Sequence, residues 1–566
     1  MKKFVIRDIS LATLLALGAL PVWAQQSQAP GVNPGTLLRN IESLQVPAKP
    51  ADKPAATEQS DDADLKPLVK LARVDVRGFD TLAPAFKLYW QDAIGKPVSA
   101  EDLAKFKIWA NDEAKEGGLY AFAQTEAEPA DNAADGEVLV VTLVAPKIKS
   151  VRIYVPDEEL AKRYEALITT RFAADFAPGS FVDPNGLDQR LEAASFDLPV
   201  SLEVAIRSAG PSLVDLVVNV SALPATPGQV SNGVVQVNNY GLKAYGRPQL
   251  MGSVSVGGFT PNALFNLTTQ LSEGVRYGRA EYEAPVEAFA GRLKAYGSRS
   301  DSHTILGGDT ATKSVSQEVG LGLTQMWGSH KSYVFKTVTE LGGRQTIGRL
   351  ALDNSETSRV EDSQLRLIWS MDNERVAREP SKLAVTLTAG EYTRLGGSEA
   401  ANVETGGYGK INVSARVQRN LNREGDWQWV GRLQAQAASR TLDGYNRMSL
   451  GGVYGVRAYT AADGVGDQGV SGSLELNRRL SGSQLVGVFY DAGVIRPNKV
   501  HVEGAFNTTY SLQALGAQWS GNVGRWYYNL TLAKGIGGYK LAEAPEQVTE
   551  SPRNPWRLSA ALSYLF

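Results

Sequence analysis

Few residues in this sequence are of the types that do covalent or metal chemistry. There is no cysteine, and the histidines number three: His303, His330 and His501. Without thiols there is no disulfide, thiolate metal site or thiol nucleophile, and three scattered imidazoles offer little for acid–base catalysis. No G-x-S-x-G, H-E-x-x-H or Walker A sequence occurs. The composition therefore argues against an enzyme, and neither a metal nor another cofactor is expected.

The first 24 residues have the layout of a secretory signal peptide. Lys2, Lys3 and Arg7 precede an apolar run over residues 9–22, and cleavage is expected after Ala24. The alternative is a membrane anchor, but the run is shorter than the ~20 residues that a spanning helix needs. We therefore expect export. The lack of cysteine fits this expectation, because an oxidising compartment makes free thiols a liability.

The charge balance bears on one class of partner. Lys and Arg together number 58, and Asp and Glu together number 60. The chain therefore has no overall positive field that would attract DNA or RNA. A nucleic-acid partner is not expected.

Residues 25–45 contain one short amphipathic segment. Four apolar residues at 36–44 fall on one helical face: Leu37, Leu38, Ile41 and Leu44. Asn33 is placed to cap this helix, and Pro34 to occupy its first position. A lone helix of about ten residues is not stable in water, so it either docks on another part of the protein or stays disordered. Residues 46–66 have the composition of a linker.

Residues 67–146 and 147–225 repeat one order of elements. In the first unit we expect a strand at 71–76, helical stretches including 100–116, and strands near 119–127 and 137–144. In the second we expect a strand at 151–155, helices at 158–171 and 184–195, and strands at 200–208 and 213–221. Two consecutive units with one strand-helix-helix-strand-strand order indicate two related α/β modules.

From residue 226 to 566 the pattern indicates strands alone. Apolar and polar residues alternate at period two, for example at 315–327, 526–532 and 556–566. No segment here approaches 18 consecutive apolar residues, so strands are the elements left to cross a membrane. We expect about sixteen strands, and a barrel of that size encloses a channel wide enough for an extended chain.

A soluble β-sandwich would show the same alternation, so further features must decide. Many of the strands run ten residues or more, as tilted spanning strands do. Aromatic residues that would form an interfacial girdle stand at strand ends: Trp327, Trp427, Trp526, Tyr528, Trp556, Tyr564 and Phe566. The opposite faces carry polar residues that a sandwich core could not hold: Glu318, Asn412, Glu475, Asn477, Asn529 and Arg557. We predict an outer-membrane antiparallel β-barrel with a wet lumen.

The order of these parts is similar to that of one known family. Signal peptide, short helix, tether, two α/β modules, sixteen-strand barrel and terminal aromatic residue together resemble the TpsB transporters of two-partner secretion, the family of FhaC, ShlB and HecB within the BamA superfamily. The family carries Val-Arg-Gly-Tyr/Phe at the tip of its long sixth extracellular loop and Phe-x-Asp-x-Gly on the barrel wall. The matching residues here are Val456, Arg457, Ala458 and Tyr459 for the first motif, and Phe489, Asp491 and Gly493 for the second.

The resemblance implies how these two motifs act together. The long loop, expected at 440–468, would fold back into the barrel. Arg457 and Asp491 would then form a charge-assisted, bidentate pair that locks the loop to the wall. The supporting residues would be Val456, Tyr459, Phe489 and Gly493. The alternative is that Arg457 is a solvated loop charge and that Asp491 faces water in the lumen.

The sequence departs from the family motif at Ala458, where the family has glycine. If that glycine needs a positive φ angle, alanine adopts it only at a cost. The local turn would then differ, while the charged pair would be untouched.

The resemblance has further implications for the rest of the chain. The helix at 36–44 would be a plug helix that lies in the lumen and can leave it. The two modules would be POTRA domains, whose exposed sheet edge accepts an extended peptide, although they could also be mere spacers. Phe566 would lie at the barrel seam as the C-terminal signature. The barrel would contact outer-membrane lipid and lipopolysaccharide, be inserted by the barrel assembly machinery and act as a monomer.

The expected function is export of an unfolded, TpsA-like adhesin, haemolysin or toxin to the cell surface without ATP, with the POTRA domains in the periplasm. One alternative is an assembly or insertion factor like BamA, which has five such modules where this chain has room for two. The other is a passive porin, which would leave both modules without a task.

Overall fold

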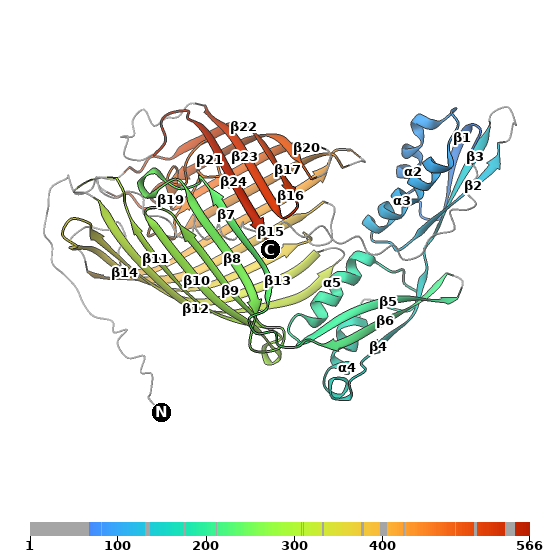
Figure 1. The fold of residues 1–566 in the computed structure, drawn as a ribbon, viewed down its shortest axis with the longest axis horizontal. Coiled ribbons are helices and arrows are strands. Elements are labelled where there is room, and N and C mark those ends of the chain that lie inside the picture. Colours follow the sequence, from blue (N-terminus) through green and yellow to red (C-terminus); the bar gives the residue numbers. More distant parts are fainter. Residues whose placement is uncertain are drawn as a thin grey trace.

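The computed structural model describes residues 67–566, with gaps at 81, 131–135, 174–175, 211, 307, 309–310, 331–332, 375–378, 397–404, 423–424, 481–482, 503–505 and 538–549. The expected signal peptide, the helix at 36–44 and the linker at 46–66 lie outside the described residues. The described chain forms two small α/β modules and one closed barrel (Figure 1).

The first module packs a three-stranded sheet against two helices. Its elements are β1 (Leu71–Arg77), α2 (Ala83–Tyr89), the 3-10 helix η3 (Gln91–Ala93), α3 (Ala100–Glu116), β2 (Phe122–Pro129) and β3 (Glu137–Val144). The sheet order is β1-β3-β2, with β1 parallel and β2 antiparallel to β3. Ser99 and Asp102 form a capping box at the start of α3: the Ser99 hydroxyl accepts from the Asp102 backbone N–H (3.1 Å), and the Asp102 carboxylate accepts from the Ser99 backbone N–H (3.2 Å). Phe86 and Phe106 fill the core.

The second module repeats this arrangement. Its elements are β4 (Lys147–Tyr154), α4 (Glu158–Ala173), α5 (Pro184–Ser195), β5 (Val200–Gly210) and β6 (Leu213–Ala222), and the sheet order is β4-β6-β5. Ile148, Phe172 and Leu216 are fully buried in its core. Helices α3 and α5 have the bounds expected from the sequence, whereas β4 begins four residues before the strand expected at 151–155. In the described part of the chain, no helix combines the length and the apolarity needed to cross a bilayer.

Sixteen antiparallel strands form the closed barrel, which confirms the expected number. The strands are β7 (Val230–Asn238), β8 (Gln249–Gly257), β9 (Leu264–Leu271), β10 (Val275–Val286), β11 (Gly291–His303), β12 (Thr312–His330), β13 (Tyr333–Leu350), β14 (Glu356–Asp372), β15 (Ser381–Gly396), β16 (Gly406–Asn420), β17 (Trp427–Ala438), β20 (Gln468–Arg479), β21 (Leu485–Arg496), β22 (Tyr510–Val523), β23 (Trp526–Ile536) and β24 (Trp556–Leu565). Two 3-10 turns, η5 (Lys243–Tyr245) and η6 (Glu287–Phe289), lie between strands.

The barrel closes where β24 pairs with β7. Their register runs from Ala561 opposite Asn238 to Leu565 opposite Val234. Phe566 extends the pairing, because its backbone N–H and C=O both bond to Gly233 (3.0 and 2.9 Å). The last residue therefore lies at the barrel seam.

The period-two alternation of the sequence separates an apolar outer face from a polar inner one. On the outer face, Val319 and Leu321 of β12 and Leu341 of β13 are more than half exposed, as suits side chains that meet lipid. On the inner face of the same two strands lie Glu318 and Glu340. The outer surface thus has the character that a bilayer requires.

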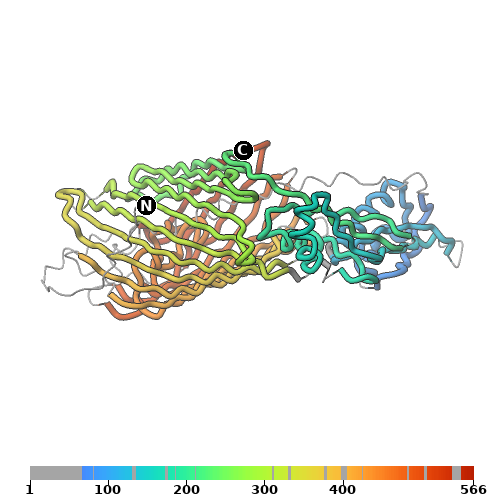
Figure 2. Tube along the Cα trace, turned by 90° about the horizontal axis from the view of Figure 1, so that it is seen from below, coloured from blue at the N-terminus to red at the C-terminus, as the bar shows by residue number. Residues whose placement is uncertain are grey.

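Both modules lie at one end of the barrel, with the second module against the strand turns and the first beyond it (Figures 1 and 2). Helix α5 packs against β12 and β13. Asn262, in the turn between β8 and β9, donates to the backbone C=O of Leu198 (3.0 Å), and Arg163 of α4 pairs with Glu287 of η6 (2.8 Å). The longest described connection, between β17 and β20, leaves the opposite end of the barrel.

Candidate functional site

The connection between β17 and β20 folds back into the barrel, and Arg457 lies at its inner tip. It contains the paired two-residue strands β18 (Met448–Ser449) and β19 (Val465–Gly466). The tip is a tight turn in which the Val456 N–H donates to the C=O of Leu450 (2.7 Å). A Cβ on Gly455 would lie 2.0 Å from that same oxygen, so glycine is required for the turn to close.

The structure brings the predicted pair Arg457 and Asp491 together. Asp491 accepts three hydrogen bonds from Arg457: from Nη2 at 2.7 Å, from Nε at 2.9 Å and from the backbone N–H at 3.0 Å. The Arg457 side chain is 5% exposed and that of Asp491 is 0% exposed. A solvated loop arginine and a water-facing carboxylate do not fit this burial. The contact is a bidentate, charge-assisted pair of the stronger kind.

Three further wall residues complete the coordination of the guanidinium. Nη1 donates to Glu475 Oε1 (2.7 Å) and Gln518 Oε1 (3.1 Å), and Nη2 donates to Ser473 Oγ (2.8 Å). Glu475 also pairs with Arg432 of β17 (2.8 Å). Arg457, Asp491 and Glu475 are buried, and the partly exposed Arg432 supplies the second positive charge, which makes the burial of two carboxylates tolerable. We call Arg457, Asp491, Glu475, Ser473 and Gln518 the tip anchor.

The remaining residues of the two motifs shape the space around this network. The Phe489 ring supports the guanidinium of Arg457, and Val456 and Tyr459 are fully buried in the apolar cluster beside it. Gly493 leaves room for the loop, because a Cβ there would come within 2.8 Å of Leu450 Cδ2. The motif residues named from the sequence thus all take part in one packed contact.

Ala458 occupies its position without backbone strain. It is 1% exposed, and it is not among the described non-glycine residues with positive φ. The turn at Ala458 does not use the left-handed conformation. Alanine in place of the family's glycine therefore has no conformational cost here.

The sequence interpretation missed Glu475, Ser473 and Gln518 as partners of the arginine. Alternation placed Glu475 and Asn477 on the inner face, but it predicted that they would face water. They are instead 1% and 2% exposed. The expectation of a wet lumen is wrong at this wall, because period-two patterning gives the side of a strand and says nothing of a loop that covers it.

Two other predicted features stand apart from the tip anchor. The Phe566 ring packs over Gly233 at the seam, where a Cβ on Gly233 would clash with it. The plug residues Leu37, Leu38, Ile41 and Leu44 lie outside the described residues, so the plug remains a prediction.

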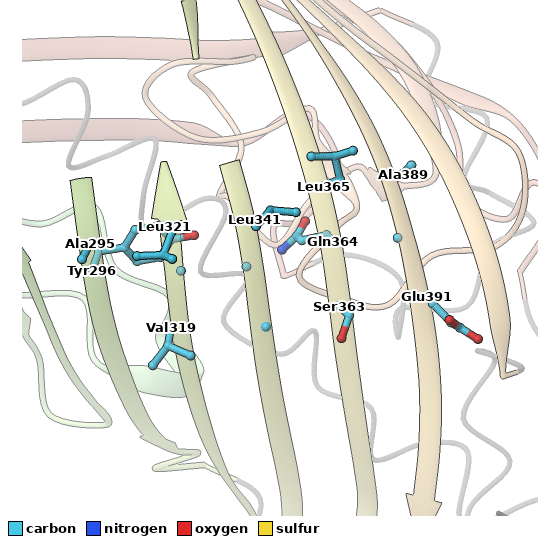
Figure 3. Close-up of a pocket in the computed structure, with 14 residues that line it drawn as sticks. Ala295, Tyr296, Val319, Leu321, Leu341, Ser363, Gln364, Leu365, Ala389 and Glu391 are labelled. Atoms are coloured by element: carbon cyan, nitrogen blue, oxygen red, sulfur yellow. The ribbon is translucent and has the colours of Figure 1, made fainter. Parts of the chain in front are cut away.

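A hollow of about 830 Å³ on the wall of β11 to β15 has a different character (Figure 3). Its lining includes the exposed side chains of Val319, Leu321 and Leu341, together with glycines of β12 and β13. These are exposed apolar side chains of the outer surface of the barrel. None of the tip-anchor residues lines this hollow.

Comparison with known proteins adds independent information. A sequence model of the haemolysin secretion/activation proteins ShlB/FhaC/HecB matches residues 217–516, which is more than half of the chain. A comparison with curated protein sequences gives no match.

Several solved structures are similar. CdiB from Escherichia coli aligns with a TM-score of 0.53 at 16% identity over 97% of this chain and 100% of its own. CdiB from Acinetobacter baumannii aligns at 0.51 with 15% identity over 97% and 100%. BamA from Haemophilus ducreyi lacking POTRA domains 1–3 aligns at 0.45 with 11% identity over 88% and 100%. At these identities the first two show a shared fold.

The family match covers β7 to β21 and part of β22, and so includes the long loop and both motifs of the tip anchor. Members of this family are outer-membrane transporters and not enzymes. The chain therefore belongs to the ShlB/FhaC/HecB family of haemolysin secretion/activation proteins, the outer-membrane transporters of two-partner secretion.

Proposed function

We propose that this protein recognises one unfolded exported polypeptide in the periplasm and passes it through the barrel lumen to the cell surface without ATP. The observation that carries the proposal is the tip anchor. A long loop is held inside the barrel by a buried, noncovalent network of hydrogen bonds and ion pairs. A contact of this kind closes a pore at rest and can be released as a unit.

The two α/β modules would act as POTRA domains (67–146 and 147–225) that capture the passenger. Among the described residues, β2 pairs only with β3 and β5 only with β6, so one backbone edge of each sheet is left for an added strand. An extended chain binds such an edge through main-chain hydrogen bonds, which do not depend on its sequence. This suits a partner that arrives unfolded.

The second module is placed to hand a captured segment to the lumen. Its helix α5 lies against β12 and β13, and Lys336 of β13 pairs with Glu192 of α5 (3.4 Å). A chain bound at β5 is therefore close to the barrel mouth. Folding of the passenger outside the cell would supply the drive for export.

The proposal includes the rest of the expected architecture. Residues 1–24 would be a signal peptide, residues 25–45 would carry the plug helix, and residues 46–66 would be the linker to the first module. The barrel at 226–566 would be inserted by the barrel assembly machinery, contact lipid and lipopolysaccharide, and work as a monomer.

Co-expression with a large exported TpsA-like protein as the candidate passenger tests the proposal. The passenger in the medium would be measured with the full chain and with a chain that lacks residues 67–225. The control is the amount of folded barrel in the outer membrane, which must be equal in both strains. We expect passenger in the medium only with the full chain.

Two outcomes would contradict the proposal. Equal passenger in the medium with both chains would show that the modules capture nothing, as in a porin. A general loss of other outer-membrane barrels on deletion of the whole gene would indicate an assembly factor instead.

A further inference from the structure

The long loop contacts the barrel at a second place, far from Arg457. The loop segment 440–447, which leaves β17, lies against the inner faces of β13 to β16. Asp443 and Asn446 of this segment bond to wall residues on all four strands. No motif in the sequence pointed to this contact.

Arg344 of β13 is at the centre of the second contact. Its Nη2 lies 2.6 Å from Asp362 Oδ2 of β14 and 2.7 Å from Asp443 Oδ2 of the loop. Its guanidinium also faces the ring of Tyr445, at 4.2 Å from the centroid. One wall arginine thus bridges one wall carboxylate and one loop carboxylate.

Two stacked tyrosines and an amide close the network. The rings of Tyr392 (β15) and Tyr408 (β16) are 4.3 Å apart and nearly parallel, and their hydroxyls donate to Asp443 Oδ1 and Asp362 Oδ1, both at 3.0 Å. Asn446 Nδ2 lies within 3.0 Å of both carboxylates (2.8 Å to Asp443, 3.0 Å to Asp362). We call Arg344, Asp362, Tyr392, Tyr408, Asp443 and Asn446 the base anchor.

Most of the base anchor is buried, with the side chain of Asp443 more accessible at 12% exposed. Asp362 and Tyr392 are 1% exposed, and Asn446 is 4% exposed. Removing one member of a buried charged network leaves its partner desolvated and unpaired, which is strongly unfavourable. The contact therefore holds the loop segment against the wall more strongly than a solvent-exposed ion pair would.

The two anchors lie on separate walls of the barrel. The base anchor involves β13 to β16 and the tip anchor involves β20 to β22, and in the ring of sixteen strands β13 and β21 are six positions apart. The loop between the anchors runs past β17, where Gln436 Nε2 donates to the backbone C=O of Asn446 (3.0 Å). Release of the tip anchor alone leaves the first part of the loop bound to the β13 to β16 wall.

We propose that the base anchor is a second latch of the loop, and that the transport path opens fully only when both anchors release. Arg344, Asp443 and Asn446 are then positioning residues for transport, since they place the loop and touch no reacting group. This inference rests on the proposed function for its purpose, but the movement it predicts needs no passenger.

The test measures the position of loop segment 440–447 directly. The chain has no cysteine, so spin labels on Gly278→Cys (β10) and Gly444→Cys (the loop segment) would be the only thiol adducts. A Cβ at either glycine meets no atom within 4 Å. Pulsed electron paramagnetic resonance on the full chain in lipid then gives the distance distribution between the labels, and planar-bilayer recording gives the fraction of time the channel is open.

Arg344→Ala and Arg366→Ala form a matched pair for this test. Arg366 of β14 also bonds two wall carboxylates, Glu340 at 3.1 Å and Glu318 at 3.4 Å, and the hydroxyl of Tyr296 on the wall at 2.9 Å, so these contacts do not involve the loop. We expect Arg344→Ala to broaden the label distance distribution and to raise the open fraction about tenfold, as loss of one of two latches should. Arg366→Ala should leave both measurements as in the wild type.

A milder variant keeps the test decisive if Arg344→Ala does not fold. Tyr392→Phe removes only the hydroxyl that contacts Asp443 and Asn446 and keeps the ring stacked on Tyr408. Tyr392→Phe should also broaden the label distance distribution and raise the open fraction. An unchanged distance distribution and open fraction in the variants that fold would overturn the second latch, whether or not a passenger is exported. If the loop moves in these variants but the chain exports no passenger, the second latch is supported and the proposed function alone is contradicted.

Discussion

The ring of Phe489 lies with its centroid 3.3 Å from the guanidinium carbon of Arg457, while Asp491, two residues further along β21, pairs with the same guanidinium. Residues at i, i+2 and i+4 of a strand point to one side. The spacing of Phe489, Asp491 and Gly493 therefore presents an aromatic face, a carboxylate and an empty position to the loop together. Phe489 and Asp491 of this motif therefore bind Arg457, and Gly493 leaves the space that Leu450 of the loop occupies.

Replacement of Phe489 by leucine should weaken the tip anchor without unfolding the barrel. Leucine keeps the apolar contact but loses the cation–π contribution, worth about 2 kcal/mol in a desolvated site. We expect a higher open fraction in bilayer recordings. Tyr490→Leu is the matched control, because Tyr490 is on the same strand but faces outward. Equal effects of the two variants would show that the aromatic contact with Arg457 is unimportant.

Arg457→Ala and Asp491→Ala should each leave the barrel inserted and impair export. Each change leaves a buried charge without its main partner, which costs about 3–5 kcal/mol. The double variant should destabilise the loop by less than the sum of the two, because the residues are directly coupled. Passenger in the medium and resistance of the barrel to unfolding by heat are the measurements. Wild-type export in either single variant would argue against the locking role.

Gly493→Ala should displace the loop through Leu450. The added Cβ would come within 2.8 Å of Leu450 Cδ2, and Leu450 is fully buried and has no room to yield. Overpacking of this kind costs about 1–3 kcal/mol. Leu450→Ala in the same chain should restore part of the loss, measured as the open fraction of the channel. If Leu450→Ala makes the defect worse, the two residues do not compete for the same space.

The contact of the second module with the barrel should depend on Arg292 of β11. Its side chain is buried, pairs with Glu283, and donates to the backbone C=O of Asn262 (2.8 Å) and of Phe196 in the module (3.4 Å). Arg292→Ala should make the connection between module and barrel more sensitive to limited proteolysis. Arg299→Ala is the control, because this arginine of the same strand is exposed and pairs with Asp301. Similar digestion of both variants would contradict the prediction.

The first module should lose stability in α3 on acidification. Hydrogen bonds from Ser99 lower the pKa of Asp102 below its ordinary value. A carboxyl group with a depressed folded pKa stabilises the fold above its unfolded pKa of about 4, and this contribution is lost as the pH falls through the folded value. Hydrogen exchange of the α3 amides should therefore show less protection below about pH 4 in the wild type. The loss should be smaller in Asp102→Asn, and an identical pH dependence would exclude Asp102 as its source.

The sequence predicted the parts of this fold that follow from local periodicity. Period-two alternation gave the strands and their inner and outer faces, and the helical stretches expected at 100–116 and 184–195 match α3 and α5 in their observed bounds. The pair Arg457 and Asp491 came from motif resemblance. The base anchor could not be found in this way, because Tyr392, Tyr408 and Asp443 are far apart in sequence. Alternation does not tell which wall a loop will cover.

A loop fastened at two places on the inner wall also occupies part of the cross-section of the barrel. Short bonds hold the two ends of the segment from Asp443 to Arg457 on β13 and β21, which are six positions apart in the ring of sixteen strands. The diameter of the closed ring is set by the number and tilt of its strands. The width available to a moving polypeptide would therefore depend on how much of this loop segment leaves the lumen once both ends are free.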